Sequence, residues 1–119
     1  MEERRAANGA SEDGRGLNAA LRQAQQVARS ADAEGLLILP ADLPLLARAD
    51  LDAILDAAAS AQVVIAPDRA ADGTNALLLA PPDALAPSFG VRSYASHRHA
   101  AELAGLSVAI VERHGLGLD

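Results

Sequence analysis

The 119-residue chain contains no cysteine, no tryptophan and no lysine, and only 2% of its residues are aromatic. The absence of cysteine excludes disulfides and thiolate metal sites, and it fits a protein of the reducing cytoplasm. With so few aromatic side chains, the core has to be built from many small aliphatic residues. All ten basic residues are arginine, which also excludes the lysine that many glycine-rich phosphate-binding loops use.

Long apolar runs and a surplus of positive charge are missing too. No apolar stretch approaches the ~20 residues that a membrane-spanning helix needs. Residues 1–5 are not followed by an apolar segment, so we expect no signal peptide. Sixteen acidic and ten basic residues give a net charge of -6, which argues against a nucleic-acid-binding surface. The length is enough for one domain with a core of its own, since a chain of this size buries roughly two-thirds of its unfolded surface.

Apolar periodicity and turn residues predict alternating helices and strands. Residues 1–15 are polar and glycine-rich and are expected to be a flexible lead-in. The expected helices are residues 18–30, 50–60 and 93–104, and the expected strands are 36–39, 63–66, 75–79 and 107–111. In the first helix, alanines, Leu21 and Val27 form an apolar side opposite arginines and glutamines. Asp50 is the expected N-cap of the second helix. The strand–helix–strand order predicts a βαβ unit, and therefore a mostly parallel sheet.

An apolar run at residues 36–39 leads directly into Pro40, Asp42 and Pro44. Such a run is typical of a strand that is buried on both faces. Pro40 ends the strand because proline cannot donate to the sheet. Asp42 is therefore expected at the carboxyl end of a central strand, where open α/β sheets bind ligands. Its carboxylate could hold a divalent cation or cap the next helix, and spacing alone does not separate these alternatives.

Two later loops carry residues that suit an anionic ligand. Gly73, Thr74 and Asn75 offer a close backbone approach, a hydroxyl and an amide. Gly90 and Ser93 stand at the start of a predicted helix, whose N–H groups suit an anion. Each has a plainer interpretation as well, Gly73 as a turn residue and Ser93 as an N-cap. Together with a carboxylate at a strand end, they predict a site for a small anion and a metal ion.

The three histidines are not predicted to form a metal cluster. His97 and His99 lie two residues apart on a predicted helix and so face different ways, and His114 is distant in the sequence. We interpret His97 and His99 as surface or partner-binding residues.

Five segments occur in an order that resembles one known family. They are GLNAAL at 16–21, PADLPL at 40–45, IAPDR at 65–69, GTNALL at 73–78 and FGxxS at 89–93. The set resembles the 2-phospho-L-lactate or phosphoenolpyruvate guanylyltransferases of coenzyme F-420 biosynthesis, a family of MobA-like nucleotidyltransferases. The resemblance covers residues 16–119. It implies a three-layer α/β/α Rossmann-like nucleotidyltransferase fold with a mostly parallel sheet, of which residues 1–119 form a single, partial domain.

The resemblance also implies a reaction and its cofactor. GTP and a small phosphorylated three-carbon acid, phosphoenolpyruvate or 2-phospho-L-lactate, would give a guanylylated acid and pyrophosphate in a cytoplasmic enzyme. Mg²⁺ would bring the two anions together. Asp42 matches the family's metal-binding aspartate, to which a catalytic role is assigned. Asp119 matches a second aspartate that faces the metal ions.

Five further residues match binding positions of that family. Thr74, Gly90 and Ser93 correspond to positions that hold the carboxylate of the acceptor acid. Leu17 and Asn18 fall where related folds approach the nucleotide. One family feature has no counterpart here. Family members bind the triphosphate with a basic loop, and no segment before GLNAAL resembles it. The sequence therefore predicts an incomplete enzyme with little or no transferase activity on its own.

Two other functions stay open at the level of sequence. One is another MobA-like transferase, acting on the molybdenum cofactor or a sugar phosphate, although Thr74 and Ser93 suit a small carboxylate better. The other is a non-catalytic binding module, which would pair through a bare sheet edge with a partner subunit or with a second copy in a homodimer.

Overall fold

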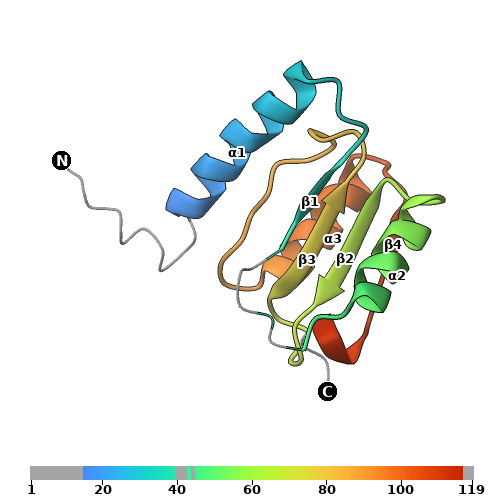
Figure 1. Ribbon diagram of the computed structural model, residues 1–119. Coiled ribbons are helices and arrows are strands. Elements are labelled where there is room, and N and C mark those ends of the chain that lie inside the picture. The colour runs from blue at the N-terminus through green and yellow to red at the C-terminus, as the bar shows by residue number, and fades with distance from the viewer. Residues whose placement is uncertain (1–14, 40–42, 44, 117–119) are drawn as a thin grey trace.

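The computed structural model describes residues 15–39, 43 and 45–116, which form a four-stranded mixed sheet and three α-helices (Figure 1). All seven helices and strands expected from the sequence are present in this part of the chain, with ends shifted by a few residues at most. The helices are α1 (Arg15–Ser30), α2 (Arg48–Ala58) and α3 (Ser93–Leu103); the strands are β1 (Leu36–Ile38), β2 (Val63–Pro67), β3 (Thr74–Leu79) and β4 (Val108–Ile110); a 3-10 helix, η3, spans His114–Leu116.

The strands are ordered β1-β3-β2-β4 across the sheet. Strand β3 runs antiparallel to both β1 and β2, and only β2 and β4 pair in parallel. The prediction of a mostly parallel sheet is therefore wrong for the described pairings, and β1 and β2 are not neighbours as a simple βαβ unit would make them. The reason is the loop at residues 68–73. It is too short for a parallel crossover, so β3 returns antiparallel beside β2.

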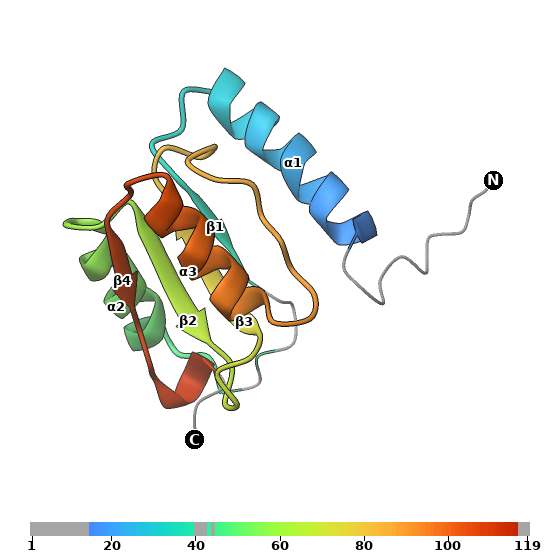
Figure 2. The ribbon, with the colours of Figure 1, turned by 180° about the vertical axis from the view of Figure 1, so that it is seen from behind.

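Helices α2 and α3 cover opposite faces of the sheet (Figures 1 and 2). Successive β2 residues point to opposite faces, so Val64 packs in the cluster that contains Ile54 of α2. Val63 and Ile65 pack in the second cluster, with Ala101 of α3. Burial on both faces explains why β2 and β3 read as unbroken apolar runs. Each fully buried aliphatic side chain contributes about 1.5–3 kcal/mol.

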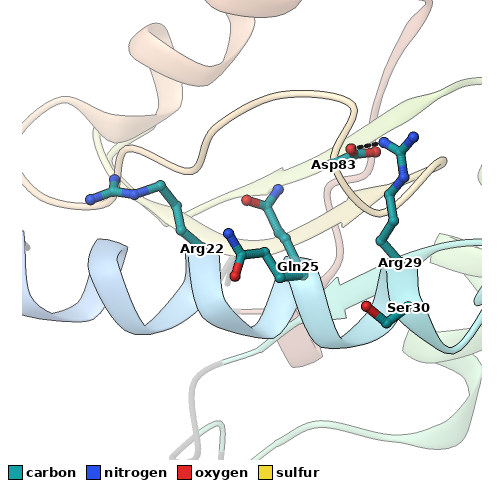
Figure 3. A pocket seen from close by; sticks show the side chains of 6 residues that line it. Arg22, Gln25, Arg29, Ser30 and Asp83 are labelled. Carbon is teal, nitrogen blue, oxygen red and sulfur yellow. Dashed lines mark hydrogen bonds and ion pairs between the residues drawn. The ribbon is translucent and has the colours of Figure 1, made fainter.

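Helix α1 lies apart from the sheet, with residues 80–92 running between the two (Figures 1 and 2). Gln25 is 6% exposed and donates to the carbonyl oxygens of Pro82, at 2.9 Å, and Leu85, at 2.8 Å. Arg29 forms an ion pair with Asp83. Figure 3 shows Gln25 and Arg29 pointing from α1 toward that loop. These polar contacts fasten α1 to the loop.

The inner face of α1 combines the buried Gln25 with Leu21, Ala24 and Ala28 of the predicted apolar side, which are half-buried, so the apolar periodicity is confirmed only in part. Val27, on the expected apolar side, is 70% exposed. The loop presents the carbonyl groups of Pro82 and Leu85, which pair with the Gln25 amide, and the carboxylate of Asp83, which pairs with the Arg29 guanidinium. Among the described residues, no helix is both long and apolar enough to cross a membrane.

The segments that were expected to hold catalytic or binding residues meet at one end of the sheet, the end at which the parallel strands finish. Strands β1, β2 and β4 all end there, and β3 begins there because it runs the other way. Thr74, the first residue of β3, pairs with Pro67, the last residue of β2. The antiparallel strand thus brings Thr74 to the strand-end edge, where α/β sheets bind ligands.

Candidate active site

A cavity of about 290 Å³ opens at this edge, between the starts of α1, β3 and α3. Such a volume suits a small molecule rather than a whole nucleotide. Six of the residues singled out in the sequence share its lining, although they come from three segments that are far apart along the chain. The lining residues are Leu17, Asp68, Gly73, Thr74, Asn75, Phe89, Gly90 and Ser93.

Buried polar side chains form a hydrogen-bond network behind this cavity. Ser93 Oγ donates to Thr74 Oγ1 at 3.0 Å, and Thr74 Oγ1 lies 3.0 Å from His97 Nδ1. The backbone N–H of Ser88 donates to His97 Nε2 at 2.9 Å. The ring of Phe89 packs edge-on against that of His97, with centroids 5.0 Å apart. Because buried polar groups are costly to leave unpaired, the network holds the Thr74 hydroxyl in one orientation.

The turn before α3 places Ser93 in this network. Gly90 has φ 132°, a conformation open mainly to glycine, and Arg92 adopts a left-handed conformation with φ 57°. Such a conformation costs a non-glycine residue roughly 1–2 kcal/mol. The N-cap is Arg92, not Ser93 as predicted, and it makes no side-chain capping bond. The Ser93 hydroxyl bonds Thr74 instead, so a tertiary contact replaces the local cap.

The first amides of α3 are less open to an anion than the sequence suggested. The N–H of Ser93 donates to the Gly90 carbonyl at 3.2 Å, and that of Tyr94 donates to the Asp72 carbonyl at 3.0 Å. Two of the groups expected to meet a ligand thus already have partners within the protein. The recognition capacity of the cavity therefore rests more on the hydroxyl groups than on the helix start.

Asp68 places a negative charge in the lining. Its Oδ1 accepts the N–H of Asp72 at 3.0 Å, which closes the loop between β2 and β3. Its Oδ2 lies so near Gly73 that a Cβ there would come within 2.7 Å. This contact explains the glycine before Thr74. A carboxylate ligand is repelled at this end of the cavity, so it is expected to sit nearer Thr74 and Ser93.

Leu17 and Asn18, predicted to approach a nucleotide, lie at the same cavity. Leu17 lines it. The Asn18 side chain pairs with the backbone of Phe89, donating to its carbonyl at 3.0 Å and accepting its N–H at 2.8 Å. Asn18 thus fastens the start of α1 to the segment that carries Phe89 and Gly90. Its hydrogen bonds describe a structural role, and the nucleotide contact stays a prediction.

Asp42 and Asp119, the predicted metal ligands, both lie outside the described residues. In the ranges that are described, no three histidine, cysteine, aspartate or glutamate side chains are grouped closely enough to hold a metal ion. The chain next to each aspartate is described, however. Leu43 packs against the core cluster that contains Leu116. The Leu45 carbonyl lies close enough to Gly115 that a Cβ there would come within 2.7 Å of it.

Asp50 holds these two segments together. It is 5% exposed, accepts the N–H of Ala47 at 2.8 Å and the Nε–H of Arg113 at 2.7 Å, and packs against Gly115. It was predicted to be the N-cap of α2, but the helix begins earlier, with Ala47 as N-cap and Asp50 in its first turn. From there its carboxylate reaches back to the Ala47 N–H and across to η3.

Sequence reasoning missed His97, which was interpreted as a surface or partner-binding residue. The structure buries it completely, whereas His99 is exposed. Burial lowers the pKa of His97 to about 4, because the charged ring would lose its hydration. A signal was available: Ser93, His97 and Ala101 are spaced four apart, so they share one face of α3, and all three are buried.

A second, larger hollow of about 540 Å³ lies between α1 and the loop that contains Asp83 (Figure 3). The polar groups that line it include Gln25 and Arg29, whose hydrogen bonds and ion pair attach α1 to the loop. We therefore interpret this hollow as part of the attachment of α1.

The fold is that of an α/β protein with a small cavity at the C-terminal ends of its parallel strands, the position at which open α/β sheets bind ligands. Comparison with known proteins narrows this class. The family model described as "Guanylyl transferase CofC like" matches residues 2–119, and the chain belongs to that family. The resemblance drawn from the five sequence segments is thereby confirmed.

Curated relatives agree with this family. A phosphoenolpyruvate guanylyltransferase of Rubrobacter xylanophilus is 46% identical over 95% of this chain and 56% of the relative. One of Conexibacter woesei is 47% identical over 87% of this chain and 48% of the relative. A 2-phospho-L-lactate guanylyltransferase of Methanothermobacter thermautotrophicus is 41% identical over 88% of this chain and 46% of the relative. The chain spans about half the length of the curated relatives it matches.

Proposed function

We propose that the cavity beside Thr74 binds a small phosphorylated three-carbon acid, and that the protein transfers GMP from GTP to the phosphate of that acid. The acid is phosphoenolpyruvate or 2-phospho-L-lactate, the two acids in the names of the relatives. The observation that carries the proposal is that Thr74, Gly90 and Ser93, the residues matched to acceptor binding, line one small cavity. These names do not favour a transferase for the molybdenum cofactor or for sugar phosphates.

In this reaction a phosphate oxygen of the acid attacks the α-phosphorus of GTP. The new P–O bond forms while the bond from the α-phosphorus to the oxygen bridging to the β-phosphate breaks, and pyrophosphate leaves with that oxygen. The chain's own task is to hold the acid so that its phosphate points out of the cavity. Fixing both reactants in this way removes much of the entropic cost of their encounter.

The cavity suits the carboxylate end of the acid. The hydroxyl groups of Thr74 and Ser93 are held by buried hydrogen bonds, so little reorganisation is needed on binding. The negative charge of Asp68 directs the ligand's carboxylate away from the β2–β3 loop and toward these hydroxyls. The phosphate then projects toward the strand-end edge, where the nucleotide would lie.

Mg²⁺ is the proposed cofactor, with Asp42 and Asp119 as its ligands. When bound, it would offset the negative charge that develops on the phosphoryl group. The chemistry of the donors fits, because Mg²⁺ prefers carboxylate oxygens.

For the whole protein we propose the three-layer Rossmann-like nucleotidyltransferase fold. The support is that α2 and α3 cover opposite faces of the described sheet. The cytoplasmic location and the homodimer stay predictions.

The site can be tested by ligand-induced stabilisation of the 119-residue chain. We expect phosphoenolpyruvate or 2-phospho-L-lactate to raise the unfolding midpoint, since a ligand at a hundredfold its Kd adds about 2.7 kcal/mol. Glucose 1-phosphate should not do so. Thr74→Val, which replaces the hydroxyl by a methyl group, should weaken binding of the acid roughly tenfold or more.

Ser96→Ala is the matched control, because Ser96 is exposed on α3. The proposal is wrong if a sugar phosphate stabilises the chain as well as the acids do, or if neither acid has an effect.

A further inference from the structure

His97 is surrounded by specific contacts but does not reach the cavity. It is fully buried, and its two ring nitrogens lie 3.0 Å from Thr74 Oγ1 and 2.9 Å from the backbone nitrogen of Ser88. Thr74 lines the cavity, whereas His97 does not. His97 therefore acts on a ligand only through its neighbours: Thr74, to which it is hydrogen-bonded, and Phe89, whose ring packs against it and also lines the cavity.

The contact with Ser88 determines which ring nitrogen carries the hydrogen. A backbone N–H can only donate, so His97 Nε2 accepts and has no hydrogen of its own. Burial lowers the pKa of His97 to about 4, so at neutral pH the ring is uncharged and carries one N–H. That hydrogen is on Nδ1, and Nδ1 donates it to Thr74 Oγ1.

The direction of the Thr74 hydroxyl follows from its two incoming hydrogen bonds. A hydroxyl oxygen accepts two hydrogen bonds and donates one. Thr74 Oγ1 accepts from His97 Nδ1 and from Ser93 Oγ, so both of its lone pairs are occupied. With the Ser93 hydroxyl donating to Thr74, the hydrogen of the Thr74 hydroxyl is available to an acceptor in the cavity, which Thr74 lines.

We propose that His97 is a positioning residue for acceptor binding: by donating from Nδ1 it obliges the Thr74 hydroxyl to act as a hydrogen-bond donor toward the cavity. A carboxylate, which only accepts hydrogen bonds when ionised, matches such a donor. A ligand group that itself only donates, such as an amide N–H, is rejected there. The inference rests on the proposed function, which supplies the carboxylate ligand.

Two substitutions of His97 separate this role from a merely structural one. In His97→Asn the amide nitrogen stands as many bonds from Cβ as Nδ1 does, so it can still donate to Thr74. In His97→Gln the amide stands where Nε2 does, so it can keep the contact with Ser88 but not the one with Thr74. We expect the Kd for phosphoenolpyruvate to rise less than threefold in His97→Asn and roughly tenfold in His97→Gln.

A double-mutant cycle tests whether the effect passes through Thr74. In a Thr74→Val background, His97→Gln should leave the remaining phosphoenolpyruvate affinity unchanged, because there is no hydroxyl left to orient. His99→Asn, an exposed histidine on the same helix, is the control and should bind as the wild type does. An equal loss of affinity in His97→Asn and His97→Gln, or a loss that persists without the Thr74 hydroxyl, would overturn the inference.

The tautomer can be checked without any ligand. A long-range proton–nitrogen correlation NMR spectrum of the wild-type chain should show His97 protonated on Nδ1 alone. Protonation on Nε2, or on both nitrogens at neutral pH, would overturn the inference while leaving the proposed function intact. Failure of the wild-type chain to bind either acid would instead refute the proposed function, and with it the ligand part of this inference.

Discussion

His97 shows how strongly one residue depends on its surroundings. It is a titratable ring in a site that excludes water, and burial lowers its pKa from 6.5 to about 4. The unfolded chain therefore binds a proton between these values that the folded chain does not. The contribution of this site to stability is complete above about pH 6.5 and is lost as the pH falls toward 4.

We expect this difference to appear in the pH dependence of unfolding. The interval from 6.5 to about 4 corresponds to on the order of 3 kcal/mol in the free energy of unfolding. In urea unfolding at about pH 7 and about pH 4.5, the wild type should lose more stability on acidification than His97→Asn does. The exposed His99 gives the control, because His99→Asn should retain the wild-type slope. Identical slopes for the wild type and His97→Asn would contradict the burial argument.

Among the elements, α2 and η3 meet closely at Gly115. A Cβ on Gly115 would lie 1.8 Å from Asp50 Oδ2 and 2.7 Å from the Leu45 carbonyl oxygen. The carboxylate is held by two hydrogen bonds, and the carbonyl belongs to the backbone, so neither moves aside easily. A side chain at this position has to separate the two segments.

Gly115→Ala is therefore expected to lower the free energy of unfolding by about 1–3 kcal/mol, as overpacking typically does. Denaturant unfolding measures this directly. Gly105→Ala is a useful comparison, because a Cβ there meets nothing within 4 Å and only its positive φ of 72° is unfavourable. That variant should lose about 1–2 kcal/mol, the cost of a left-handed φ in a non-glycine residue, and Gly115→Ala should lose more. If Gly105→Ala lowered the free energy of unfolding as much as Gly115→Ala does, or more, the close contact at Gly115 would not be what destabilises the variant.

In the molecule as a whole, α1 is joined to the rest by polar contacts. Asn18 pairs with the backbone of Phe89, and Gln25 donates to two carbonyls of the same loop. Neither of the two core clusters found in the described residues includes a residue of α1. Helix α1 should therefore open independently of the sheet.

The double variant Asn18→Ala/Gln25→Ala should release α1 while β2 and β3 stay folded. Loss of these hydrogen bonds is expected to lower the local opening free energy of α1 by about 2–4 kcal/mol. Hydrogen exchange should then accelerate across Arg15–Ser30 and remain slow in both strands. Gln23→Ala/Gln26→Ala, on exposed positions of the same helix, should leave exchange unchanged. Equal acceleration in β2 and β3 would show that α1 belongs to the cooperative core.

The helices and strands, and the family to which the chain belongs, could be predicted from local patterns in the sequence. The apolar run ended by a proline located β2 because a strand that is buried on both faces has no polar alternation. The same pattern located β1, but the prediction of a central strand buried on both faces is wrong there: β1 is half-buried and stands at the edge of the described sheet. The ordered motifs pointed to Thr74, Gly90 and Ser93, which the structure brings to one cavity. Motif order can predict such a set because each motif keeps its own local backbone conformation.

Only the tertiary structure decided the strand order, the burial of Gln25 on α1 and the burial of His97. The position of β3 between β1 and β2 depends on which strand edge is free when the β2–β3 loop closes, whereas its antiparallel direction follows from the shortness of that loop. The burial of Gln25 depends on the carbonyl groups of a loop that is distant in sequence. His97 is neutral and oriented because Ser88 and Thr74 meet it from other segments. Periodicity in the sequence indicates which side chains share one face of a helix or strand. The segment against which that face packs is decided by long-range contacts.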